Sequence, residues 1–174
     1  MSDGILALDL ATVTGWAHGF PGAVPVSGSV RIGREGSSVE VFLSAFYQWL
    51  DETLARCPAR IFIFEAPFIR DGRTSGDTAR KLQSLAGIAG MLAYDRGFPP
   101  ERICEADSVQ VCKAFTGRGH FKGDRDRKKL LVMNRCRELG WEPTDNDAAD
   151  ALALFRFAES KFYPNARQVE RLAV

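Results

Sequence analysis

Acidic residues in this chain have the types and surroundings of a hydrolytic site. Asp9 lies near the end of a short apolar run, Glu65 ends the run RIFIFE, and Asp147 and Asp150 lie three residues apart in DNDAADALAL. Short apolar runs are typical of buried β-strands, and a spacing of three places two helical residues on one face. We expect the four carboxylates to converge if that helix packs against neighbouring strand ends.

A cluster of four carboxylates indicates a hard divalent cation. Like charges at one place repel each other and raise one another's pKa values. Oxygen ligands without histidine or thiolate favour Mg²⁺, or Mn²⁺ as an alternative. Two such ions about 3.5–4 Å apart activate a water molecule and stabilise the leaving oxygen of a phosphodiester. The acids therefore predict two ions per active site, although each acid alone has an ordinary alternative, such as answering a helix dipole or pairing with arginine.

The charge is unevenly distributed along the chain. Lys and Arg number 23 and Asp and Glu 22 among 174 residues, a formal net charge of +1. Residues 113–137, however, carry nine basic side chains against two acids. A local positive field on a nearly neutral protein favours a polyanionic partner such as nucleic acid. The alternative is an ordinary solvated helix face.

The elements that must position these residues follow the order βββ-α-β-α-β-α…α. This pattern predicts an α/β fold with a mixed five-stranded sheet, a β-meander followed by alternating helices, and helices on both faces. We expect a single domain over 1–163 and a short tail over 164–174. The expected strands are 5–10, 16–20, 24–32, 60–65 and 102–106. Two helices are expected over 77–95 and 125–139. Three more are expected to end at about 54, 115 and 161, and their caps are Ser37 or Ser38, Asp107 or Ser108, and Asp145 or Asn146 in turn.

Four segments resemble, in the same order, those of the RuvC-type Holliday-junction resolvases, which belong to the RNase H-like (retroviral-integrase) superfamily. They are ILALDLATVTGW around Asp9, IFIFEAPF around Glu65, VQVCKAFTG around Lys113, and DAADALA from Asp147. The resemblance runs from about residue 5 to residue 155. It implies the RNase H-like fold and an endonuclease that resolves four-way or branched DNA by paired nicks, leaving 5′-phosphates.

The resemblance assigns roles to individual residues. Lys113 matches a lysine that supports catalysis or binds the scissile phosphate, and Phe68 matches an aromatic residue that stacks at the junction centre. A second basic residue opens the following helix, and either Arg127 or Lys128 matches it. The implied metal ligands are Asp9, Glu65, Asp147 and Asp150. The side chains expected to contact DNA are Phe68, Arg70, Arg73, Lys113, Arg118, Lys122, Arg125, Arg127, Lys128 and Lys129. His120 is a further candidate for phosphate contact, and His18 is expected within the sheet.

The chain departs from the cellular bacterial enzymes in two places. Leu10-Ala11 stands where those enzymes have Pro-Gly, and the loop that leads to Thr14-Gly15 is one residue shorter. The loop 116–126 is longer and more basic. Both features resemble a divergent branch found in phages and related mobile elements, and neither affects the metal ligands.

Family members act as homodimers, because two symmetric nicks require two active sites. We expect the helix at 77–95 to form the interface, since Ala86, Gly87 and Gly90 would let two backbones approach closely; packing of these small residues on their own sheet is the alternative. The four cysteines form no metal-binding spacing and are interpreted as reduced thiols. No membrane span or signal peptide is expected, and the location is expected to be cytoplasmic and DNA-associated.

Three other functions share some of these features. An RNase H-like nuclease that acts on flaps, forks or RNA–DNA hybrids would have the same acids. A non-catalytic junction-binding module would be expected to lack an acid, and none is lacking. A sugar-kinase-like or actin-like phosphotransferase shares the D-x-x-x-x-T-G pattern, but such enzymes use two domains and this chain has no glycine-rich phosphate loop.

Overall fold

The computed structural model describes residues 3–34, 36–65, 76–121 and 124–166. Five strands form one mixed sheet in the order β3-β2-β1-β4-β5, and five α-helices pack on it, which confirms the predicted α/β fold class. The strands are β1 (Ile5–Asp9), β2 (Val13–Gly19), β3 (Val26–Arg31), β4 (Ile61–Glu65) and β5 (Ile103–Ala106). The helices are α1 (Val39–Arg56), α2 (Gly76–Asp95), α3 (Ser108–Thr116), α4 (Arg125–Glu138) and α5 (Asn146–Phe162), with a single 3₁₀ turn at Pro100–Arg102.

The first three strands form the expected meander, and the last two are added by crossovers. β1 pairs antiparallel with β2 and parallel with β4, and β4 pairs parallel with β5. β2 starts at Val13 and not at residue 16, because its backbone pairs with β1 as far as Gly15 and with β3 as far as Val13. The near-continuous apolar runs of β1 and β4 follow from burial on both faces of the sheet.

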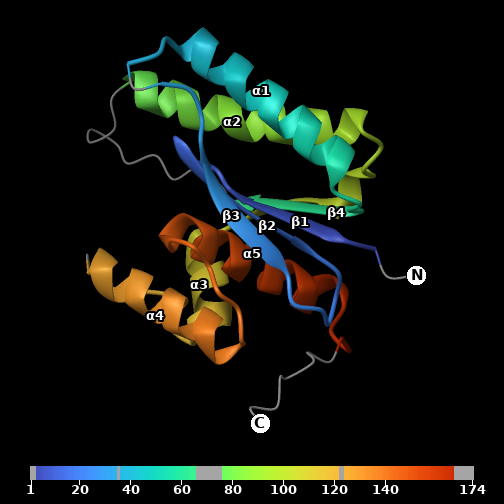
Figure 1. Ribbon diagram of the computed structural model, residues 1–174, viewed down its shortest axis with the longest axis vertical. Helices are drawn as coiled ribbons and strands as arrows, with labels where there is room; N and C mark the ends of the chain where they lie inside the picture. Colours follow the sequence, from blue (N-terminus) through green and yellow to red (C-terminus); the bar gives the residue numbers. More distant parts are fainter. Residues whose placement is uncertain (1–2, 35, 66–75, 122–123, 167–174) are drawn as a thin grey trace.

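The two faces of the sheet are covered by different helices. In Figure 1, α1 and α2 lie on one side, and α3, α4 and α5 lie on the other. The α1–α2 side holds bulky residues such as Leu8, Phe46 and Phe62, all buried. The α5 side brings small residues together, including Ala7 and Ala17, so that this helix packs close to the strands. No helix within the described ranges is long and apolar enough to cross a membrane.

Aspartate caps begin all three helices on the α5 side. Asp107, Asp124 and Asp145 each accept a hydrogen bond from a backbone N–H of the first helical turn. A carboxylate at this position satisfies an otherwise unpaired donor and stabilises the helix dipole. The predicted tail begins just after α5, and residues 167–174 lie outside the described part of the chain, so the boundary at residue 163 stays a prediction.

Candidate active site

Asp9 and Glu65 occupy the carboxyl ends of two neighbouring parallel strands. β1 and β4 pair with Leu8 opposite Phe64, and the next residue along each strand is an acid. Side chains alternate between the two faces of a strand. Asp9 and Glu65 therefore point to the same face as the alternate core residues before them, which pack against α3, α4 and α5. The strand register explains why two acids far apart in the sequence share one edge of the sheet.

The other two acids come from the first turns of α5, which crosses beneath β1 and β2 (Figure 1). Gly15 of β2 pairs with Asp9, and the backbone carbonyl of Asp147 lies so close to Gly15 that a Cβ atom there would overlap it. This contact brings Asp147 and Asp150 beside the strand ends. Each of them acts electrostatically on Asp9.

The four half-buried acids perturb one another strongly. Burial, followed by the charges of Glu65, Asp150 and Asp147, raises the pKa of Asp9 well above its usual range. Burial, with Asp150 also contributing, raises the pKa of Glu65 to about 7. Burial also raises the pKa values of Asp147 and Asp150. Such a site favours an added cation, because a cation removes the cost of holding these charges together.

Lys128 of α4 is the basic residue that the structure places among these acids. Burial lowers its pKa, but the charges of Asp150 and Glu65 outweigh burial and raise the pKa above the usual value. Lys128 in turn lowers the pKa values of Asp9, Glu65 and Asp150. Arg127, the other candidate, is exposed. The geometry therefore favours Lys128 over Arg127 as the basic residue of the site, and its catalytic role stays a prediction.

An open groove of about 460 Å³ lies beside this cluster, and Glu65, Asp150 and Lys128 line it. One wall of the groove carries the charged side chains of β4, α4 and α5. The other wall is formed by the beginning of α3 and by the loop that follows this helix. Its lining residues are Glu65, Ser108, Val109, Cys112, Gly119, His120, Phe121, Asp124, Arg125, Lys128, Lys129 and Asp150. A groove with mixed charges and apolar walls is suited to a nucleotide chain, whose phosphates and bases differ in the same way.

The donor set fits a hard divalent cation. The carboxylates of Asp9, Glu65, Asp147 and Asp150 offer only oxygen atoms, which Mg²⁺ and Mn²⁺ prefer. Across the described ranges, no three His, Cys, Asp or Glu side chains converge closely enough to form a ready-made metal centre. Magnesium is usually held by one or two carboxylates together with substrate phosphates, so an incomplete protein cage beside an open groove is compatible with it.

The predicted DNA-contacting residues divide into three groups. Arg125, Lys128 and Lys129 line the groove. Lys113, Arg118 and Arg127 are exposed and do not line it, so the predicted role of Lys113 at the scissile phosphate stays a prediction. Phe68, Arg70, Arg73 and Lys122 lie outside the described residues.

Ser108 belongs to the candidate site, although the sequence pattern predicted it only as a possible helix cap. Its side chain is hydrogen-bonded to Glu65 and lowers the pKa of that carboxyl, and it also lines the groove. The cap of α3 is in fact Asp107, whose Oδ1 accepts from the backbone N–H of Gln110 at 2.9 Å. A serine directly after an aspartate cap is a common helix start, so the sequence held no signal for this second contact.

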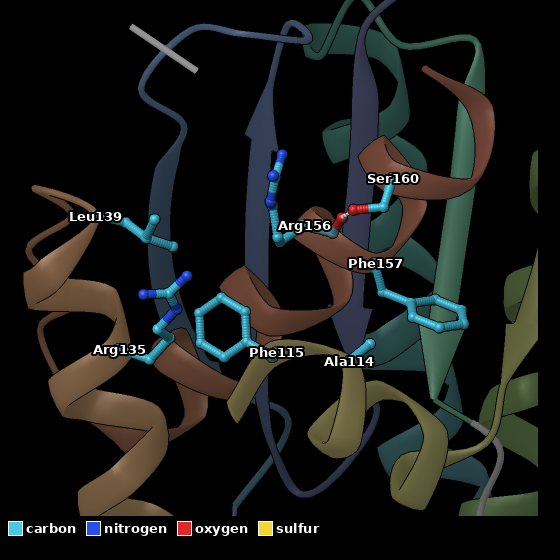
Figure 2. A pocket seen from close by; sticks show the side chains of 7 residues that line it. All are labelled: Ala114, Phe115, Arg135, Leu139, Arg156, Phe157 and Ser160. Carbon is cyan, nitrogen blue, oxygen red and sulfur yellow. Dashed lines mark hydrogen bonds between the residues drawn. The ribbon is translucent and has the colours of Figure 1, made fainter. Parts of the chain in front are cut away.

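A smaller pocket of about 130 Å³ lies between α3, α4 and α5, away from the acids (Figure 2). It contains two arginines, but each is paired within its own helix. Arg135 contacts Glu138 at 2.8 Å, and Arg156 is paired with Glu159. Because these charges are already used, we assign the functional site to the groove and not to this pocket.

Comparison with known proteins identifies the fold. No protein-family model matches the sequence, and no curated protein matches it significantly. Two solved structures of Thermus thermophilus RuvC, one in complex with a Holliday junction substrate, are similar at 20% and 19% identity, with TM-scores of 0.68 and 0.64. They cover 93% and 94% of this chain and 94% and 98% of their own chains.

A third similar structure is that of the yeast mitochondrial Holliday junction resolvase Ydc2. It is 12% identical with a TM-score of 0.57, and the match covers 92% of this chain and 81% of that chain. The chain therefore has the RNase H-like fold of RuvC-type resolvases, as the sequence resemblance implied.

Proposed function

We propose that this protein is a divalent-metal-dependent endonuclease that cuts four-way or other branched DNA. One observation carries the proposal: acids from β1, β4 and α5 meet Lys128 beside a groove, on a fold shared with a RuvC that was captured on a Holliday junction substrate. A structural role for the cluster is disfavoured, because burial and mutual repulsion make these ionised acids costly without a ligand.

The chain's own residues account for each requirement of phosphodiester hydrolysis. Divalent cations bound at the site would supply an activated water and stabilise the leaving oxygen. Asp9, which is central to the cluster, would hold the ions together with Glu65 and Asp150, with Asp147 assisting. Lys128 holds a positive charge where a scissile phosphate would enter. The products are expected to carry 5′-phosphate and 3′-hydroxyl ends, as the family resemblance implies.

The groove's basic wall supports DNA as the substrate. Arg125 and Lys129 are exposed on α4 and line the groove together with the half-buried Lys128. Lys and Arg side chains of this kind bind phosphates and position a nucleic acid without reading its sequence. The phosphate backbone would run along the beginning of α4 and bring one phosphodiester to the acids.

A homodimer through α2 is part of the proposal. Apart from adjacent residues and the backbone of α2 itself, no described atom lies within 4 Å of a Cβ built on Gly87 or Gly90, whereas Ala89 and Ala93 are buried. The two glycines therefore face away from the protein's own core. Met91 and Tyr94 beside them are 49% and 61% exposed. An exposed strip of glycines flanked by large apolar side chains suits close packing of two α2 helices.

The test is a cleavage assay with labelled DNA. Four-way junction, flap, fork, linear duplex and RNA–DNA hybrid are incubated with purified protein and Mg²⁺, Mn²⁺ or EDTA. Paired symmetric nicks in the junction alone, lost in EDTA, are expected. Equal cutting of flaps, forks or hybrids would replace junction resolution with a broader nuclease activity. Binding without cleavage in either metal would overturn the enzymatic proposal.

A further inference from the structure

The start of α5, the helix that carries Asp147 and Asp150, is hydrogen-bonded to β3, an edge strand of the sheet. Ser29 Oγ of β3 donates a hydrogen bond to Asp145 Oδ2 at 2.5 Å. The other oxygen of this carboxylate accepts from the backbone N–H of Ala148 at 2.8 Å. One carboxylate thus caps α5 and ties the helix start to an edge strand.

Ser29 belongs to a row of three residues that crosses the meander. Asp9 of β1 pairs with Gly15 of β2, and Gly15 pairs with Ser29 of β3. Residues paired in register lie side by side across a sheet and point to the same face. The row therefore presents, in order, an acid of the site, a position without a side chain, and a hydroxyl group to the start of α5.

Gly15 provides the space that this helix start occupies. A Cβ atom on Gly15 would overlap the backbone carbonyl of Asp147 and would lie 3.3 Å from the backbone nitrogen of Ala148. The start of α5 therefore rests on the backbone of β2, directly beside Asp9. No other residue type could occupy position 15 without moving the helix away from the sheet.

We propose that Gly15, Ser29 and Asp145 are positioning residues that set where Asp147 and Asp150 stand relative to Asp9. The inference deepens the proposed function and rests on its metal site. A shift of α5 by one residue moves its side chains 1.5 Å along the axis and rotates them by about 100°. Metal sites tolerate errors of only about 0.5 Å. The contact between Gly15 and the Asp147 backbone sets the distance of α5 from the sheet. The hydrogen bond from Ser29 to Asp145 resists sliding and rotation of α5 about its axis.

The first test compares two variants that differ in one group. Ser29→Thr keeps the hydroxyl group, and Ser29→Val has a methyl group in its place. The two variant side chains have the same size and are both β-branched. Mn²⁺ is titrated into each DNA-free protein by calorimetry, with Asp9→Asn as the control for binding elsewhere. We expect Ser29→Val to weaken Mn²⁺ binding about tenfold, as supporting residues of metal sites do. Ser29→Thr is expected to restore binding to within about twofold of the native protein.

Hydrogen exchange over 144–152 supplies a second readout. Faster exchange is expected in Ser29→Val than in Ser29→Thr, since the helix start loses a tether. A merely structural role for Ser29 would change exchange and thermal stability but leave the Mn²⁺ affinity the same in both variants. That result would overturn the proposal, as would failure of the native protein to bind Mn²⁺ at Asp9.

The second test separates position from stability. Gly15→Ala is compared with Gly4→Ala, because a Cβ on Gly4 would overlap the backbone carbonyl of Pro58, at the opposite end of β1. Both variants lose stability. Only Gly15→Ala is expected to weaken Mn²⁺ binding, by about 10–100-fold. Equal Mn²⁺ affinities in the two would contradict the role of Gly15. If Gly15→Ala does not fold, the Ser29 pair decides.

These measurements are independent of the substrate. Native protein that binds Mn²⁺ through Asp9 but cuts none of the branched DNAs would overturn the proposed function and leave the positioning role standing. Normal junction cleavage, with equal Mn²⁺ affinity in Ser29→Val and Ser29→Thr, would do the reverse.

Discussion

Two carboxylates on the α5 side of the sheet, the buried Glu159 and the half-buried Asp9, have opposite surroundings. Glu159, near the end of α5, has a side chain only 1% exposed. It accepts a hydrogen bond from the backbone N–H of Gly22 at 2.7 Å and is paired with Arg156. Asp9, at the end of β1, is surrounded by three other acids. Within the described part of the chain, no hydrogen-bond donor reaches its carboxylate.

The difference separates an acid whose bonds are made within the protein from one that the proposed function assigns to a metal ion. A buried carboxylate with a cation and a backbone donor has its bonds satisfied within the protein, and it ties the β2–β3 turn to α5. Asp9 instead lies among like charges, of which Glu65, Asp150 and Asp147 all raise its pKa. Repulsion among like charges is relieved by a bound cation, so the surroundings of Asp9 favour a ligand from outside the chain.

The sharpest way to test the comparison is Asp9→Asn. The change removes a charge that the proposed metal site requires and that the metal-free fold does not. Loss of metal stabilisation worth several kcal/mol corresponds to a fall of about 10³-fold in junction cleavage. Junction binding and melting temperature are expected to hold or rise. Cleavage by Asp9→Asn at the native rate would show that Asp9, like Glu159, is not needed for catalysis.

Glu159→Ala should show the opposite pattern. The change leaves the Arg156 guanidinium (Figure 2) and the Gly22 N–H without their hydrogen-bond partner. We therefore expect a loss of about 3 kcal/mol in the free energy of unfolding. Cleavage per folded molecule is expected to be unchanged. Glu138→Ala is the matched control, because Arg135 and Glu138 form an exposed pair of the same spacing, worth under about 1 kcal/mol. Urea unfolding of the three proteins measures the difference.

Stability of the metal-free protein should fall as the pH rises toward 7. Burial raises the pKa of Glu65 to about 7 in the folded state, against an ordinary value near 4.3. The folded protein therefore holds a proton that the unfolded chain releases between these values, so the free energy of unfolding decreases as pH increases across this window. Melting temperatures in EDTA from pH 5 to 8 measure this, and Glu65→Gln should weaken the dependence. Mg²⁺ is expected to raise the melting temperature more at pH 8 than at pH 5.

The smallest expected effect concerns the cations near each acid. Lys129 lines the open groove, whereas Arg135 is paired with Glu138 beside the small pocket. Lys129→Ala should weaken junction binding a few-fold and lower the salt slope by about one. Arg135→Ala, on the same helix, should leave the slope unchanged. Equal salt dependence of junction binding in the two variants would show that Lys129 does not contact the DNA.

Much of the fold could be predicted because its signals are local. The apolar runs that end in Asp9 and Glu65, the helical spacing of Asp147 and Asp150, and the order of elements follow from periodicity along the chain. The start of β2 was predicted too late, because Gly15 has no side chain to continue an alternating pattern and its strand geometry comes from pairing with Asp9.

Local sequence patterns were enough to predict which acids form the candidate site, which elements carry them, and that neighbouring strand ends would bring two of them together. The folded structure was needed to place Lys128, and not Arg127, among these acids. It was also needed to show that Gly15 leaves space for the start of α5 and that Ser29 is hydrogen-bonded to it. The same holds for Glu159, whose partner Gly22 is far away in the sequence. These outcomes depend on contacts between elements distant along the chain, and such contacts are set by packing and register, which no local pattern of residues encodes.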